Sequence, residues 1–244
     1  MKHPPRKRLT FRADANKDVA SFFAFIVDAS YDGGRNIKWA ILNKYPACKK
    51  WFQCEKFIGH RVDVVQFIKE KHTHHANSID KNLINYERKW RVIEPKFDKL
   101  VKEIFGDYPW PKGKYIAYST IWGIYPRFLE DKTFQVPYRF RNKRYVNVVI
   151  AHELLHFIFY EYFHAHYPRY RSDDYNVLSW HVSEIFNTIV QNSVSWRKIF
   201  GLPSMGDPVH KKIVEKLSHI HTGEPCWNLD KLIQDIVVNA EKLP

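Results

Sequence analysis

The sequence predicts an α+β protein in which a small mixed sheet packs against one apolar helix. Three observations lead to this class. The first 105 or so residues have a mainly helical pattern. Two segments near the middle are rich in aromatic and β-branched residues, and a long apolar run follows them. Strands that cluster in one part of a chain, with helices before and after them, are typical of α+β domains.

The length and composition of the chain indicate one globular domain. A chain of 244 residues can fill one sizeable core, and a hydrophobic content of 45% lies outside the disordered range. We therefore expect a single domain over residues 1–244. Its mainly helical N-terminal part would cover 1–108, and its core, which carries the candidate site, would cover 109–244.

The first elements are predicted to be two short helices. Residues 17–29 and about 37–57 have helical patterns, and Gly33-Gly34 between them indicates a turn.

A longer helical region is predicted next. Residues 61–75 place apolar side chains at helical spacing, and residues 79–104 continue the pattern. Pro95 should end or kink this second stretch, because proline lacks the N–H that a helix interior needs. Three histidines are expected to mark an exposed helix end between the two stretches: His72, His74 and His75.

Two strands are expected in the middle of the chain. Residues 114–125 and 132–140 contain period-two stretches, and a turn at Glu130-Asp131 would join them. Pro137 suits an edge strand or a strand end, because it cannot donate to a sheet ladder.

The C-terminal half is predicted to be helical again. A helix over about 144–167 should stop at Pro168, and a second should run from about 175 to 199 with Gly201 as its C-terminal stop. Two amphipathic helices should follow within 208–244. Three side chains can cap the start of the second helix: Ser172, Asp173 and Asp174.

The helix over 144–167 carries His152, Glu153 and His156 within an uncharged run. Residues i and i+4 share a helix face, so both imidazoles can direct a nitrogen at one zinc ion. Glu153 would lie beside the open position of the metal and accept a proton from water whose pKa the zinc lowers from about 15.7 towards roughly 7. The alternative, two buried histidines with a buried ion pair, leaves the desolvation of these groups uncompensated.

The stretch His152-Glu153-Leu154-Leu155-His156, with its uncharged flanks and a preceding strand, resembles the active-site helix of the zincin metallopeptidases. The resemblance covers about residues 115–200. It implies a zincin-like fold in which a peptide substrate adds a strand to the sheet edge ahead of the active-site helix, here residues 132–140.

The resemblance also bears on the third zinc ligand. The metzincin branch requires a glycine and a further histidine where this chain has Phe159 and Tyr162, which excludes that branch. The gluzincin branch takes a glutamate from the next helix, and Glu184 follows the second histidine by 28 residues. His181 lies nearer the apolar face of that helix and is the rival ligand. Asn187 would bond a ligand or the active-site helix.

A peptidase also needs a donor for the oxyanion that forms during attack on the substrate. The sequence does not rank the four candidates: Tyr167, Tyr170, Tyr175 and His210.

The cysteines and the N-terminal segment indicate the cellular compartment. An odd number of cysteines without a paired metal-ligand spacing (Cys48, Cys54 and Cys226) indicates reduced thiols, with Cys48 and Cys54 packed in helices. The apolar stretch 19–27 is too short to span a bilayer, and no signal core follows the basic N-terminus, so we expect a cytoplasmic protein.

The predicted function is a cytoplasmic zinc metallopeptidase with one zinc ion per chain, His152, His156 and Glu184 as ligands and Glu153 as general base. Its substrate would be a peptide or protein, and its oligomeric state stays open. Two alternatives remain. The net charge of +13 favours anionic partners and allows a DNA-associated regulator or protease. A zincin-fold binding protein that holds the metal without hydrolysis is the other.

Overall fold

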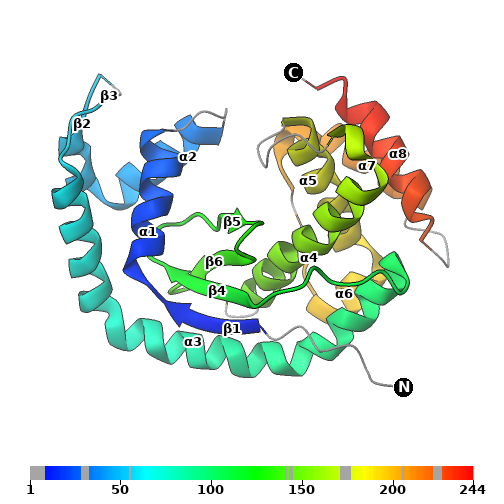
Figure 1. The fold of residues 1–244 in the computed structure, drawn as a ribbon, viewed down its shortest axis with the longest axis horizontal. Helices are drawn as coiled ribbons and strands as arrows, with labels where there is room; N and C mark the ends of the chain where they lie inside the picture. The colour runs from blue at the N-terminus through cyan, green and yellow to red at the C-terminus, as the bar shows by residue number, and fades with distance from the viewer. Residues whose placement is uncertain are drawn as a thin grey trace. The chain divides into compact units, whose positions relative to one another are not determined.

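The computed structural model describes residues 9–28, 33–54, 56–140, 142, 145–170, 177–204, 206–221 and 227–243. In this part of the chain helices predominate beside a small mixed sheet, which confirms the α+β class (Figure 1). The chain forms two compact units. Unit 1 comprises Met1–Arg88 and Lys114–Asn142, and unit 2 comprises Lys89–Gly113 and Lys143–Pro244. This division differs from the predicted parts 1–108 and 109–244, because the sheet belongs with the N-terminal helices.

Unit 1 begins with short elements. In order they are β1 (Leu9–Ala13), α1 (Ala15–Phe22), the π-helical turn η1 (Phe23–Val27), α2 (Gly33–Lys44), the 3₁₀ helix η2 (Pro46–Trp51), β2 (Phe52–Gln53) and β3 (Lys56–Phe57). Asp14 caps α1 by accepting from the main-chain N–H of Asn16. Gly33 and Gly34 open α2 and do not form the predicted turn. The predicted helix over 37–57 was too long, because Pro46 starts a 3₁₀ turn and β2 then pairs with β3.

Cys48 and Cys54, both predicted to pack within helices, differ in their burial. Cys48 is fully buried in the aromatic core of unit 1, where burial raises the pKa of its thiol to about 12. Cys54 is exposed in the turn between β2 and β3, so its prediction as a helix-packing thiol was wrong.

One helix, α3 (Arg61–Phe105), replaces the two predicted over 61–75 and 79–104. Pro95 lies inside it and does not end it. The turns after the proline bury Phe97, Leu100 and Val101, and this burial favours continuation of the helix despite the lost hydrogen bond. The expected helix end at the histidine cluster was also wrong, because these residues lie well inside α3.

The sheet of unit 1 has the strand order β1-β4-β6-β5. Its later strands are β4 (Tyr115–Thr120), β5 (Arg127–Phe128) and β6 (Thr133–Pro137). The predicted strand segments are present, but β4 and β6 are parallel neighbours, and the turn at Glu130-Asp131 joins β5 to β6. Pro137 ends β6, as predicted.

The prediction that residues 132–140 form the edge strand to which a peptide substrate adds was wrong. The strand within residues 132–140 pairs with β4 on one side and with β5 on the other, so β6 is an inner strand. On that side the two residues of β5 lie opposite Thr133 and Phe134, and the main-chain N–H of Gln135 donates to the carbonyl oxygen of Pro126 at 3.0 Å.

A buried carboxylate joins the layers of unit 1. Asp18 is 0% exposed, and its Oδ2 accepts from His72 Nε2 at 2.7 Å and from the main-chain N–H of Ile121 at 3.0 Å. Its Oδ1 accepts from Gln135 Nε2 at 3.1 Å, and Ser21 Oγ donates to Gln135 Oε1 at 2.9 Å. Because each group in this network has partners, the network can lie within an apolar core.

Unit 2 holds the end of α3 and the C-terminal helices. These are α4 (Tyr145–His166), the 3₁₀ turn η3 (Pro168–Tyr170), α5 (Val177–Asn192), α6 (Val194–Phe200), the 3₁₀ turn η4 (Pro208–His210), α7 (Lys211–His221) and α8 (Leu229–Ala240). Helix α4 and the two C-terminal helices agree with the predictions. The predicted helix over 175–199 is divided at Ser193, whose side chain caps α6. Gly201 ends α6 at a φ of 69°, as predicted.

Several predicted details lie outside the described residues. They are the capping side chains Ser172, Asp173 and Asp174, together with Tyr175 and Cys226. None of the helices in the described part of the chain combines the length and the apolar character needed to cross a bilayer.

Candidate metal centre

Helices α4 and α5 pack against each other in unit 2 and bring three predicted side chains together. His152 Nε2 and His156 Nε2 lie 3.0 Å apart. The carboxylate of Glu184 reaches both rings, with Oε2 3.5 Å from His152 Nε2 and Oε1 3.3 Å from His156 Nε2. Glu184, which was placed only by resemblance, therefore faces both histidines.

These three side chains fit a zinc ion. Ligand atoms held about 2.0–2.1 Å from a tetrahedral zinc lie about 3.3 Å from each other. The imidazole nitrogens are 3.0 Å apart, and each faces a different carboxylate oxygen of Glu184 at 3.5 or 3.3 Å, so the separations are close to that value. Two imidazoles and one carboxylate also form a donor set found in catalytic zinc sites, which leaves a fourth position for water. The group is partly accessible to solvent, since the side chains of His152 and Glu184 are 24% and 18% exposed, whereas His156 is 0% exposed.

Glu153 lies beside these three side chains, and it is further from His152 than Glu184 is. Its Oε1 is 3.9 Å from His152 Nε2, whereas Glu184 approaches the same atom to 3.5 Å. Donor atoms of His152, Glu153 and His156 also lie within 4.8 Å of one another, so Glu153 is within reach of the same ion. Glu184 lies nearer to His152 Nε2 than Glu153 does, and it faces both imidazoles.

Two amides of α5 hold the first histidine in place. Asn187 Nδ2 donates to the main-chain oxygen of His152 at 3.1 Å, which is the predicted contact with the candidate active-site helix. Gln191 Nε2 lies 2.6 Å from His152 Nδ1, and Gln191 is buried. Sequence reasoning missed Gln191. Its spacing of seven residues from Glu184, which places both on one helix face, was the available signal.

His181, the alternative third ligand, contacts His210. His181 Nδ1 is 2.7 Å from His210 Nε2, and both residues are buried beside the ring of Trp180. Burial lowers the pKa of both imidazoles, and each lies close enough to Asp207 for that carboxylate to oppose the shift. The carboxylate of Glu184 also lies close enough to His210 to raise the pKa of its imidazole.

The candidate oxyanion donors do not share one set of contacts in the described part of the chain. The hydroxyl of Tyr167 donates to the main-chain oxygen of Asp230, and that of Tyr170 donates to Glu241 Oε1. Tyr175 lies outside the described residues. His210 is the member of this set whose pKa responds to Glu184.

The pair of buried histidines predicts a pH dependence of stability. In the folded chain the pKa of each lies below its ordinary value of 6.5, so the unfolded chain binds more protons as the pH falls through that value. Unfolding free energy of the metal-free protein should therefore be highest above about pH 6.5 and fall below it, by up to about 1.4 kcal/mol per pH unit for each histidine.

Urea unfolding between pH 8 and pH 5 measures this dependence. His210→Gln should flatten it, whereas the exposed His219→Gln should leave it as in the wild type. An equal slope in wild type and His210→Gln contradicts the assignment.

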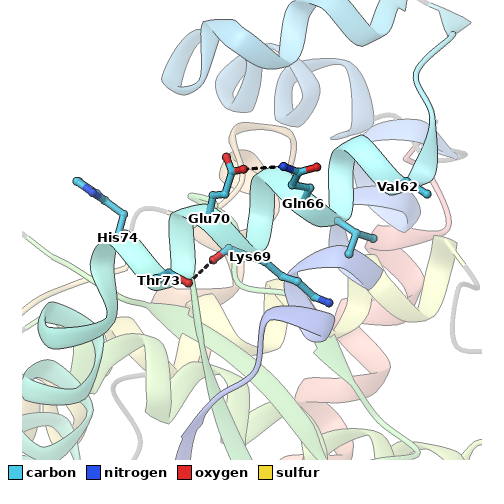
Figure 2. A pocket seen from close by; sticks show the side chains of 7 residues that line it. Val62, Gln66, Lys69, Glu70, Thr73 and His74 are labelled. Carbon is cyan, nitrogen blue, oxygen red and sulfur yellow. Dashed lines mark hydrogen bonds between the residues drawn. The ribbon is translucent and has the colours of Figure 1, made fainter.

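A surface hollow is present in unit 1, on a different helix from this centre. Figure 2 shows its lining side chains, all from α3. Gln66 Nε2 donates to Glu70 Oε1 at 3.0 Å, and Thr73 Oγ1 donates to the main-chain oxygen of Lys69 at 3.0 Å (Figure 2). These bonds run along α3 itself, and the lining of the hollow does not include the two imidazoles and the carboxylate that approach one another on α4 and α5. The centre on α4 and α5 is therefore the candidate functional site.

Comparison of the chain with protein-family models, with curated proteins and with solved structures found no match to any of them.

Proposed function

We propose that the protein is a zinc-dependent metallopeptidase of gluzincin-like type, in which His152, His156 and Glu184 hold one zinc ion and Glu153 is the general base. The observation that carries the proposal is the convergence of two imidazole nitrogens and a carboxylate to within 3.0–3.5 Å, between two helices whose packing is largely apolar. The substrate would be a peptide or protein.

The chemistry divides between the ion and the chain. A zinc ion in this set would polarise the scissile carbonyl and lower the pKa of water. Glu153 supplies a carboxylate that is not needed as a ligand. It can accept a proton from the attacking water and deliver it to the amine that leaves. Leu154 and Leu155, both 0% exposed, contribute to the apolar packing of this helix.

A peptide-cleavage assay tests the proposal. The purified protein, incubated with a mixed peptide library, should cleave peptide bonds, lose the activity when a chelator removes the metal, and recover it when zinc is added. Cleavage that persists without metal contradicts the zinc mechanism. A protein that binds zinc and cleaves no member of the library supports instead a metal-containing binding protein.

The charge distribution favours a second candidate function, binding to nucleic acid. Unit 1 contains 22 Lys and Arg against 11 Asp and Glu, a net charge of +11, which leaves +2 for unit 2. Within 33–61 seven basic residues accompany one acid, Glu55, and the exposed Trp39 offers a ring on which a base can stack.

Salt dependence of binding tests this second function. Labelled single-stranded DNA should bind the full chain and lose affinity steeply between 50 and 200 mM salt, by about 300-fold if about six phosphates are neutralised. The variant Lys49→Glu/Lys50→Glu should weaken binding, whereas Lys211→Glu/Lys212→Glu in unit 2 should not. Equal binding by both variants contradicts an interface in unit 1.

A further inference from the structure

Gln191 contacts the ring nitrogen of His152 that is not directed at Glu184. Its Nε2 lies 2.6 Å from His152 Nδ1, and Gln191 is 2% exposed. It follows Glu184 by two helical turns on the same face of α5. One face of this helix therefore supplies both a candidate ligand and a contact that controls a ligand on α4.

The direction of this hydrogen bond decides where His152 carries its proton. An amide nitrogen can only donate, so His152 Nδ1 must accept with its lone pair. In a neutral imidazole the proton then lies on Nε2, from which it can be donated to His156 Nε2 at 3.0 Å. An Nε2 atom that carries a proton has no lone pair for a cation. This hydrogen-bond arrangement therefore matches the metal-free protein.

Binding of a cation requires the opposite tautomer. His152 Nε2 must then present its lone pair, which moves the proton to Nδ1 and makes Nδ1 a donor. The oxygen end of a carboxamide has nearly the same size as the nitrogen end, and a half-turn about the last side-chain bond exchanges them. Gln191 can therefore serve either tautomer without repacking its buried surroundings.

We propose that Gln191 is a positioning residue whose carboxamide reverses with the state of the centre. Its Nε2 donates to His152 Nδ1 in the metal-free protein, and its Oε1 accepts from Nδ1–H when His152 Nε2 is a ligand. The proposal rests on the zinc centre of the proposed function and deepens it. It identifies the residue that selects the ligand tautomer of His152.

Two substitutions separate this role from simple packing. Gln191→Leu keeps much of the volume and removes both hydrogen bonds, so it should weaken zinc affinity by about 10- to 100-fold. Gln191→Glu supplies an acceptor that holds Nδ1–H, so its zinc affinity should equal or exceed that of the wild type. Asn192→Leu is the matched control, because Asn192 bonds Thr188 and Ser204 and not His152.

The experiment measures zinc affinity of wild type, Gln191→Leu, Gln191→Glu and Asn192→Leu by competition with a chromogenic chelator. The expected order places Gln191→Leu well below the other three. If Gln191→Leu matches the wild type, or if Gln191→Glu is as weak as Gln191→Leu, the proposal is overturned while the zinc centre stands. A wild-type protein that binds no zinc overturns both.

A spectroscopic measurement decides the case if Gln191→Leu does not fold. The ¹⁵N shifts of the His152 ring in the wild type should report a proton on Nε2 without metal and on Nδ1 with zinc. A proton on the same nitrogen in both states overturns the reversal.

Discussion

Replacement of Glu153 by Gln is expected to lower peptidase activity by at least about a hundredfold while zinc content stays near one ion per chain. The amide keeps the size of the side chain but cannot accept a proton as a carboxylate does. Zinc should remain because the proposed donors are His152, His156 and Glu184, with Glu153 Oε1 further away at 3.9 Å from His152 Nε2. Steady-state cleavage rates and elemental analysis on the same preparation measure both quantities.

The matched control is Glu161→Gln, an exposed glutamate two turns later on the same helix. It should retain wild-type activity and zinc. Loss of zinc from Glu153→Gln would make Glu153 a ligand or a structural residue, and full activity in that variant would remove Glu153 from the mechanism.

Substitution of Asp18 by Ala is expected to have the largest effect on folding, a loss of about 3–5 kcal/mol of unfolding free energy. The change leaves the buried donors of Ile121 and Gln135, and the half-buried ring of His72, without the carboxylate that accepts from them. Each buried donor without a partner costs about 1–3 kcal/mol. Urea unfolding followed by circular dichroism measures the loss.

Asp63→Ala provides the comparison for this variant. Asp63 is exposed in the first turn of α3, so its removal should change unfolding free energy by less than about 0.5 kcal/mol. A loss below about 1 kcal/mol for Asp18→Ala would show that the network contributes little to the stability of unit 1.

The features that the sequence predicted well depend on local spacing. Helix α4 follows from a long apolar run that stops before Pro168, and the shared face of His152 and His156 follows from their spacing of four residues. The two C-terminal helices follow from amphipathic periodicity. The approach of Glu184 to both histidines was expected because a resemblance directed attention to the next helix, and its role as a ligand stays a prediction. Within that helix a solvated glutamate and one that faces α4 have the same local pattern, and only packing against α4 distinguishes them.

The features that the sequence did not predict depend on contacts between distant residues. Pairing of β4 with β1 and β6 as parallel neighbours cannot be inferred from alternation, which is the same in either direction. Pro95 ends many helices, and here burial of the following turns prevails. Gln191 is one glutamine in an apolar helix, and only the fold brings its side-chain nitrogen to 2.6 Å from His152 Nδ1.

The side-by-side zinc affinity of Glu184→Ala and His181→Ala tests the ligand set most directly. Wild type should bind about one zinc per chain, Glu184→Ala should lose most of its affinity, and His181→Ala should remain near wild type because His181 contacts His210. Circular dichroism of each variant verifies folding in the same buffer. If His181→Ala strips the metal and Glu184→Ala retains it, the ligands are three histidines and the gluzincin-like assignment is wrong.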